Sequence, residues 1–249
     1  MSVTIALRDL RALLGSPFGW VLAAVGYFVL AWRFLQLVDV YQLELEGLVV
    51  QLDAAYGVTE LVAAPFFGDA WLLLVLLLTV AVLSMRLVVD ERQQGTLSLL
   101  FAAPVRSSAI VLGKFFGAGA FLTLLLLLWA LMPFSLQIGT ALDLGRLLAA
   151  WLGLWLMGLG LLACAVLASS LTAQPGLAAA LTFTFGLLLM LLQQGSEASG
   201  ALARLSLLAH YRPFLAGVVS TADLAYFALL AVGALVLAVR RLDSLRVQA

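Results

Sequence analysis

Long runs of apolar residues alternate with short polar segments along most of this 249-residue chain. Each run is close to the length of about 20 residues that an α-helix needs to cross roughly 30 Å of hydrocarbon. The pattern predicts an all-α polytopic membrane protein with a single transmembrane domain over residues 1–249. Its six predicted spans cover residues 18–38, 71–89, 110–134, 147–168, 175–192 and 222–239.

The first 16 residues carry a different pattern, in which apolar positions recur at the spacing of one helix face. These positions are 3, 7, 10 and 14, whereas Thr4, Arg8 and Arg11 fall on the other side. The segment also lacks the short apolar core and the cleavage site of a signal peptide. We expect an amphipathic helix that lies flat on the inner leaflet before the chain turns into the membrane at Pro17.

The composition excludes several classes of protein. The chain is 65% hydrophobic and 10% charged, with a mean hydropathy of +1.16, whereas soluble domains are about one quarter charged. A net charge of zero offers no basic field for nucleic acid. The single cysteine, Cys164, excludes an internal disulfide framework. Much of the apolar surface must therefore be covered by the lipid bilayer.

Arginine and lysine residues set the predicted orientation. If both termini are cytoplasmic, nine of these residues lie on the inner side and four on the outer side. The inner nine are Arg8, Arg11, Arg86, Arg92, Arg106, Lys114, Arg240, Arg241 and Arg246, and the outer four are Arg33, Arg146, Arg204 and Arg212. The bias predicts a protein of the bacterial inner membrane with both ends in the cytoplasm.

The polar segment between the second and third predicted spans, residues 90–113, is the most informative part of the chain. Gly95 permits a turn, Thr96 can cap a short helix, and Pro104 would end that helix. Its apolar residues share one face: Leu97, Leu100 and Phe101. Such a helix can dock into a groove on a soluble partner. The other interpretation is an ordinary loop on the membrane surface.

The residues of this segment resemble the signature of ABC-2-type exporter permeases. The matching residues are 91–100 (Glu-Arg-Gln-Gln-Gly-Thr-Leu-Ser-Leu-Leu), Ala103-Pro104-Val105 and Val111-Leu112-Gly113-Lys114. The resemblance implies six spans, cytoplasmic ends, an amino-terminal interface helix, and a coupling helix that contacts a nucleotide-binding subunit. The residues that it implies for ATPase coupling are Glu91, Arg92, Gly95, Thr96, Leu97, Leu100, Phe101 and Pro104.

Residues at both ends resemble the gliding-motility (Gld) branch of these permeases. The segments are 16–22, 205–208, 210–214, 217–219 and 223–227. Permeases linked to nitrous-oxide accessory functions share some of these motifs. The resemblance implies membership of the Gld-type branch.

The chain is not expected to be an enzyme. It contains no Gly-x-x-x-x-Gly-Lys-Ser/Thr loop, because Gly113-Lys114 is followed by Phe115 inside a span. The resemblance therefore implies that ATP and Mg are bound by two copies of a cytoplasmic ABC ATPase, and that a second copy of this chain or a paralogous permease completes the membrane part. His210 has no cysteine or carboxylate at ligand spacing, so we expect an interface histidine and no metal site.

Of three candidate functions, two fit these observations. The leading one is an ABC permease that couples ATP hydrolysis by a separate subunit to export or to a conformational change. The alternative is a mechanotransmitting or scaffold subunit of a gliding-type envelope complex, which moves a membrane protein with a periplasmic domain. A secondary transporter is disfavoured because the span centres carry almost no charge. Arg33 and Asp69, near span ends, either meet headgroup water or form a pair that gates the outer exit.

Polar and small residues inside the spans are expected to serve packing. Hydroxyl groups should bond to the backbone of their own helix, and glycines should permit close helix contact. The hydroxyl residues are Thr79, Ser84, Thr123, Thr182 and Thr184, and the glycines are Gly113, Gly117, Gly153, Gly158 and Gly160. Ser107 or Ser108 is expected to cap the third span, and Lys114 to extend to the headgroups. A short outer helix is expected around Leu205 and Leu208.

Overall fold

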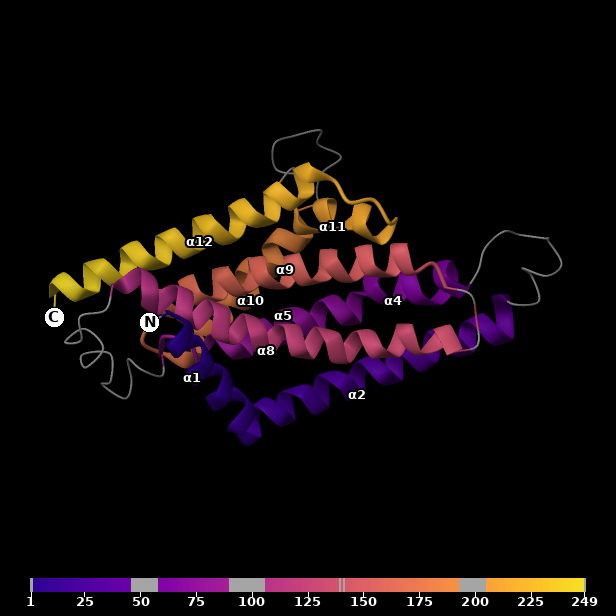
Figure 1. Cartoon of the computed structure of the whole chain (residues 1–249), viewed down its shortest axis with the longest axis horizontal. Coiled ribbons are helices and arrows are strands. Elements are labelled where there is room, and N and C mark those ends of the chain that lie inside the picture. The colour runs from indigo at the N-terminus through magenta and orange to yellow at the C-terminus, as the bar shows by residue number, and fades with distance from the viewer. Residues whose placement is uncertain are drawn as a thin grey trace.

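The computed structural model describes residues 2–45, 58–89, 106–138, 140, 142–192 and 205–248, and these residues form helices with no strand among them (Figure 1). The long helices are α1 (Ser2–Gly15), α2 (Pro17–Val40), α5 (Ala70–Ser84), α8 (Ser107–Ser135), α9 (Leu144–Leu171), α10 (Pro175–Leu191) and α12 (Thr221–Gln248). The short elements are η1 (Tyr41–Leu45), η2 (Thr59–Ala63), α4 (Ala64–Gly68), η3 (Leu136–Ile138) and α11 (Leu207–Leu215).

Five helical stretches in the described residues are long and apolar enough to cross a membrane. They are Pro17–Leu43, Thr59–Ser84, Ser107–Ile138, Leu144–Leu171 and Thr221–Arg246. They correspond to five of the six predicted spans. The remaining one, predicted at 175–192, is the apolar helix α10 of 17 residues. At 1.5 Å per residue α10 is about 26 Å long, slightly less than the hydrocarbon thickness, so the count of six remains a prediction.

The second span differs from its predicted range of 71–89. Its helical stretch begins at Thr59, changes direction at Asp69, where the backbone is extended, and ends at Ser84. Residues 85–88 form turns. Asp69 causes the change because its carboxylate accepts a hydrogen bond from Trp71 N at 2.8 Å and so caps α5.

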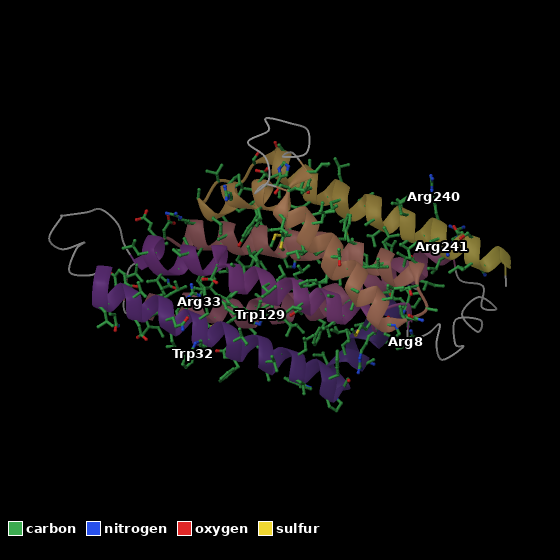
Figure 2. All side chains as sticks on the ribbon, turned by 180° about the vertical axis from the view of Figure 1, so that it is seen from behind. Arg8, Trp32, Arg33, Trp129, Arg240 and Arg241 are labelled. Carbon is green, nitrogen blue, oxygen red and sulfur yellow. The ribbon has the colours of Figure 1, made fainter. Side chains whose placement is uncertain are left out.

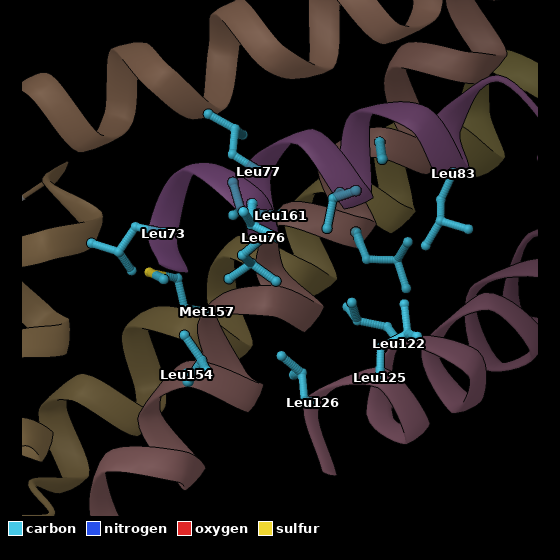
Figure 3. Packing of buried hydrophobic residues seen from close by; sticks show 14 of the residues in the cluster. Leu73, Leu76, Leu77, Leu83, Leu122, Leu125, Leu126, Leu154, Met157 and Leu161 are labelled. Carbon is cyan, nitrogen blue, oxygen red and sulfur yellow. The ribbon is translucent and has the colours of Figure 1, made fainter. Parts of the chain in front are cut away.

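Helix α9 lies at the centre of the bundle, in contact with α5, α8, α10, α11 and α12 (Figure 1). Leucine side chains fill the space between α5, α8 and α9, with Leu76, Leu122 and Leu161 almost completely buried (Figure 3). In the most apolar part of α9, 72% of the residues are buried, against 22% for the α2 and α12 stretches. The first and last spans are therefore peripheral, and their outward faces are available to lipid or to another subunit.

Glycines bring neighbouring helices into close contact, as expected. A Cβ atom at Gly117 would lie 2.8 Å from the carbonyl oxygen of Ala6, so α1 packs directly on α8. A Cβ at Gly153 would lie 2.6 Å from Phe214 of α11, and one at Gly158 would lie 3.3 Å from Leu122. The hydroxyls of Ser84, Thr123 and Thr182 likewise bond to carbonyls of their own helices, which confirms their packing role.

The amino-terminal helix is present and packs on α8. Val3 and Leu7 are exposed, whereas Leu13 is buried and Asp9 faces α8. Asp9 pairs with Lys114, an attraction that apolar spacing does not reveal. Its location on the membrane surface remains a prediction.

Two other expectations concern helix starts. Neither Ser107 nor Ser108 caps α8, because the N-cap is Arg106, which makes no side-chain capping bond. The expected outer helix is α11, which begins after Ser206; the Ser206 hydroxyl accepts a hydrogen bond from Ala209 N at 3.4 Å.

Candidate functional site

The eight predicted coupling residues lie outside the described residues. They are Glu91, Arg92, Gly95, Thr96, Leu97, Leu100, Phe101 and Pro104. The structure does describe the two places where the chain enters and leaves residues 90–105, at Val89 and Arg106. The candidate site therefore consists of the residues that directly precede or follow that segment and of the side chains that contact them.

After α5 the chain continues in tight turns, in which some backbone groups have no partner within the helix. Arg86 N bonds to Leu83 O at 3.0 Å and Leu87 N to Ser84 O at 3.4 Å, both three residues back. The following backbone groups bond to side chains of other helices. Leu87 O accepts from Lys114 Nζ at 2.8 Å, and Val88 N and Val89 N donate to Ser169 Oγ at 2.9 and 3.2 Å.

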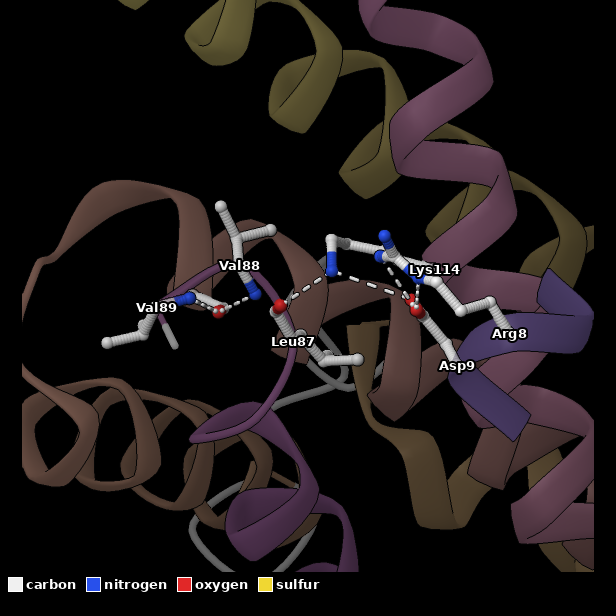
Figure 4. A network of polar contacts seen from close by, with 7 residues as sticks. Arg8, Asp9, Leu87, Val88, Val89 and Lys114 are labelled. Carbon is white, nitrogen blue, oxygen red and sulfur yellow. Dashed lines mark hydrogen bonds and ion pairs between the residues drawn. The ribbon is translucent and has the colours of Figure 1, made fainter. Parts of the chain in front are cut away.

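Lys114 is the charged centre of this arrangement (Figure 4). It is 3% exposed, so the expectation that it extends to the headgroups was wrong. A buried ammonium is costly unless it is paired and hydrogen-bonded. Leu87 O provides the hydrogen bond, and Asp9 Oδ2 lies 3.5 Å from Lys114 Nζ. Arg8 in turn pairs with Asp9 at 3.0 Å, so charges alternate from α1 into the bundle.

The corner between α1 and α2 is tied to the same place. Arg86 Nη1 donates to Ser16 Oγ at 3.0 Å, and the Arg86 guanidinium lies 4.0 Å above the Phe18 ring. We use the name inner cluster for Asp9, Leu87, Val88, Val89, Lys114 and Ser169. Through the inner cluster, the backbone of Leu87 to Val89 is bonded to Lys114 of α8 and Ser169 of α9, and Lys114 in turn pairs with Asp9 of α1.

The inner cluster joins the end of the second span to α8, α9 and α1 through buried polar contacts. Buried hydrogen bonds and an ion pair resist separation because each lost partner leaves an unsatisfied group. Among the described residues no group of three or more His, Cys, Asp or Glu side chains could hold a metal ion.

Two further ion pairs lie toward the other end of the bundle. Arg33 Nε is 2.8 Å from Asp69 Oδ2, so the two residues form an ion pair, and the gating of an outer exit by that pair remains a prediction. Arg146 Nη1 is 3.2 Å from Glu60 Oε1, and Arg146 Nε donates to Leu215 O at 3.0 Å. The first pair joins α2 to the start of α5. The bonds of Arg146 join α9 to both η2 and α11.

Substitution of Asp69 is expected to lower stability in two separable ways. Asp69→Ala removes both the cap of α5 and the partner of Arg33, and we expect a loss of about 2 kcal/mol. Asp69→Ser keeps a capping oxygen and loses only the ion pair, so its loss should be smaller. Thermal unfolding of the purified chain in detergent measures both variants. Equal losses would show that the cap contributes nothing.

His210 has the satisfied partner that was expected of an interface histidine. Its Nδ1 lies 2.6 Å from Asp223 Oδ1, and its ring stacks on Tyr226 at 4.0 Å between centroids. The carboxylate comes from a position 13 residues later, at the start of α12. The pair fixes α11 against α12.

Reasoning from the sequence missed Asp9 and Ser169 as members of the site. One signal was available, since Lys114 is a lone basic residue within an apolar span and requires a counter-charge. The partner could not be identified, because Asp9 and Lys114 are 105 positions apart. Ser169 carries no signal, since one serine near a helix end is common.

Most of the chain matches a known protein family. Residues 3–241 match the family model described as ABC-2 family transporter protein. No curated protein matches the chain. The matched range runs from α1 into the last turns of α12, so it includes every residue of the inner cluster.

Proposed function

Since this chain belongs to the ABC-2 family of transporter proteins, we propose that it converts ATP hydrolysis by a separate subunit into a movement of its own helix bundle. It is an integral membrane protein and a permease subunit of an ABC transporter, a class whose partner is an ABC ATPase. We propose that two ATPase copies bind ATP and Mg, and that a second copy or a paralogue of this chain completes the membrane part. Both termini would lie in the cytoplasm.

The inner cluster is the observation that carries this proposal. A segment that receives force must be firmly connected to the parts that it moves. The backbone at Leu87, Val88 and Val89 is bonded to Lys114 and Ser169, on the two helices α8 and α9. A surface loop with no mechanical role would not require a buried ammonium at its base, given the cost of burying one.

The proposed mechanism follows from these contacts. Closure of the ATPase on nucleotide would push on residues 90–105. The push would reach Leu87 and be passed to α8 through Lys114 and to α9 through Ser169. Because the leucine core of α5, α8 and α9 is closely packed, these helices would move together as a rigid body.

Variants in the proposed coupling segment test this mechanism. Glu91→Arg reverses a charge, and Gly95→Trp places a bulky side chain at the turn that the sequence predicts. We expect either variant to lower the coupling of ATP hydrolysis to activity by about tenfold or more, while the bundle keeps its unfolding temperature. The measurement is ATP hydrolysis by the co-purified complex in liposomes, with and without its transported substrate or partner protein.

One matched control makes the result clear. Ser98→Ala alters the same segment without a change of charge or turn geometry, and it should behave like the unchanged protein. Absence of any co-purifying ATPase, or normal coupling in both Glu91→Arg and Gly95→Trp, would contradict the proposed function.

The alternative is a mechanotransmitting or scaffold role in a gliding-type complex. The resemblance of residues 205–227 to Gld-type permeases favours it, and these residues form α11 and the start of α12. In that case a partner with a periplasmic domain, and no transported substrate, would stimulate ATP hydrolysis. The same liposome measurement distinguishes the two roles.

A further inference from the structure

Five charged side chains from separate parts of the chain line one cavity of about 760 Å³. They are Arg33 of α2, Glu60 of η2, Asp69 before α5, Arg146 of α9 and Arg212 of α11. Figure 2 shows Arg33 toward the end of the bundle opposite to that of Arg8, Arg240 and Arg241. The cavity is thus remote from the inner cluster.

The charges on the described residues of the cavity do not balance. Asp69 pairs with Arg33 at 2.8 Å, and Glu60 pairs with Arg146 at 3.2 Å. Arg212 is exposed, and its side chain makes no hydrogen bond or ion pair with the part of the chain that the structure describes. Among the described residues that line the cavity, three guanidinium groups stand against two carboxylates, which leaves one positive charge in excess. The cavity is therefore suited to a ligand that carries negative charge.

The paired arginines are held ready for such a ligand. Arg33 uses Nε for Asp69 and Nη1 for Gln36, while Arg146 uses Nε for Leu215 O and Nη1 for Glu60. In both cases the second terminal nitrogen, Nη2, makes no hydrogen bond to a described residue. Fixed guanidinium groups with spare N–H donors match the oxygens of phosphate groups, and less ordering is required on binding.

The position and the walls of the cavity indicate how a ligand would reach it. Arg33 is 16 residues beyond Pro17, or about 24 Å along α2, close to the far boundary of the hydrocarbon. Leu37, Pro65 and Trp71 add an apolar wall, and Trp71 is 53% exposed. Tryptophan is favoured at this depth, where lipid headgroups begin.

We propose that this cavity binds a phosphate group, with Arg212 as the principal charge and with Arg33 and Arg146 as hydrogen-bond donors. The phosphate belongs either to a lipid headgroup or to a soluble ion. The site goes beyond the proposed function, because the chain binds this ligand alone and without an ATPase. Its failure would leave the coupling mechanism untouched.

Binding to the purified full-length chain in neutral detergent tests the proposal. Native mass spectrometry follows phosphatidylglycerol binding, and calorimetry follows inorganic phosphate binding. We expect Arg212→Gln to weaken binding by about tenfold, as is typical for the loss of one charge-assisted contact. Arg240→Gln removes an exposed arginine from the other end of the bundle and should change nothing.

The outcomes separate the sources of the phosphate. Binding of both probes, each weakened by Arg212→Gln, supports a site for the phosphate group itself. Weakened binding of the lipid alone supports a headgroup site, and weakened binding of the ion alone supports a soluble ligand. Arg212→Lys keeps the positive charge but lacks the planar guanidinium, so its binding affinity should lie between those of the unchanged chain and Arg212→Gln. Absence of binding by either probe, or equal binding by the unchanged chain and Arg212→Gln, would overturn the proposal.

Discussion

Replacement of Lys114 with methionine is expected to destabilise the bundle by about 3 kcal/mol and to uncouple it from ATP hydrolysis. The substitution leaves Leu87 O without its buried donor, a loss of about 1–3 kcal/mol. It also removes the Lys114 partner of Asp9 at 3.5 Å, so that Asp9, whose side chain is 19% exposed, keeps only the pairing with the exposed Arg8 among the described residues. Thermal unfolding in detergent measures the stability, and ATP hydrolysis by the reconstituted complex measures the coupling.

A second substitution shows which contact dominates. In the double variant Asp9→Asn with Lys114→Met, neither partner remains charged, so part of the lost stability should return. Arg106→Met is the matched control, because Arg106 is an exposed cation at the start of the same helix. A Lys114→Met variant as stable and as well coupled as Arg106→Met would contradict the role given to the inner cluster.

Replacement of Gly117 with leucine is expected to separate α1 from α8 and to cost about 3 kcal/mol. Even the Cβ atom would lie 2.8 Å from Ala6 O and 3.1 Å from the Asp9 Cβ. Since the first of these neighbours is backbone, it can move only with the whole of α1. Displacement of α1 would also carry Asp9 away from Lys114, so coupling should fall together with stability.

The control for this substitution lies on the last span. A Cβ atom at Gly233 of α12 would meet no heavy atom of the described residues within 4 Å, so Gly233→Leu should be close to neutral. Gly117→Ala should give an intermediate loss. Thermal unfolding of the three variants measures the effect, and an equal result for Gly117→Leu and Gly233→Leu would show that α1 does not rest on α8.

Most of the helical layout could be predicted because one physical requirement dominates it. A span must present about 20 apolar residues to lipid, and this requirement can be recognised locally. The polar details could not be predicted in the same way. The partner of Arg33 is 36 positions away, and that of Lys114 is 105 positions away. Pairing across such separations depends on which helices become neighbours.

The coupling segment illustrates a different limit. Its proposed role came from a resemblance at residues 91–114, and the family match at residues 3–241 confirms the ABC-2 family, while the Gld-type branch remains a prediction. The inner cluster adds what the motif alone does not contain. Ser169 and the backbone of Leu87 to Val89 take part through geometry, and neither residue type has a chemical signature in the sequence.

The pairing of Arg33 with Asp69 has a consequence for the order of biogenesis. The ribosome adds Arg33 before Asp69, which lies 36 residues later. The first span therefore enters the bilayer with an uncompensated guanidinium, at a cost below the roughly 2.5–3.5 kcal/mol of a helix centre because Arg33 lies near its end. We expect the arrival of Asp69 with the second span to neutralise this charge, which would favour early pairing of the first two spans.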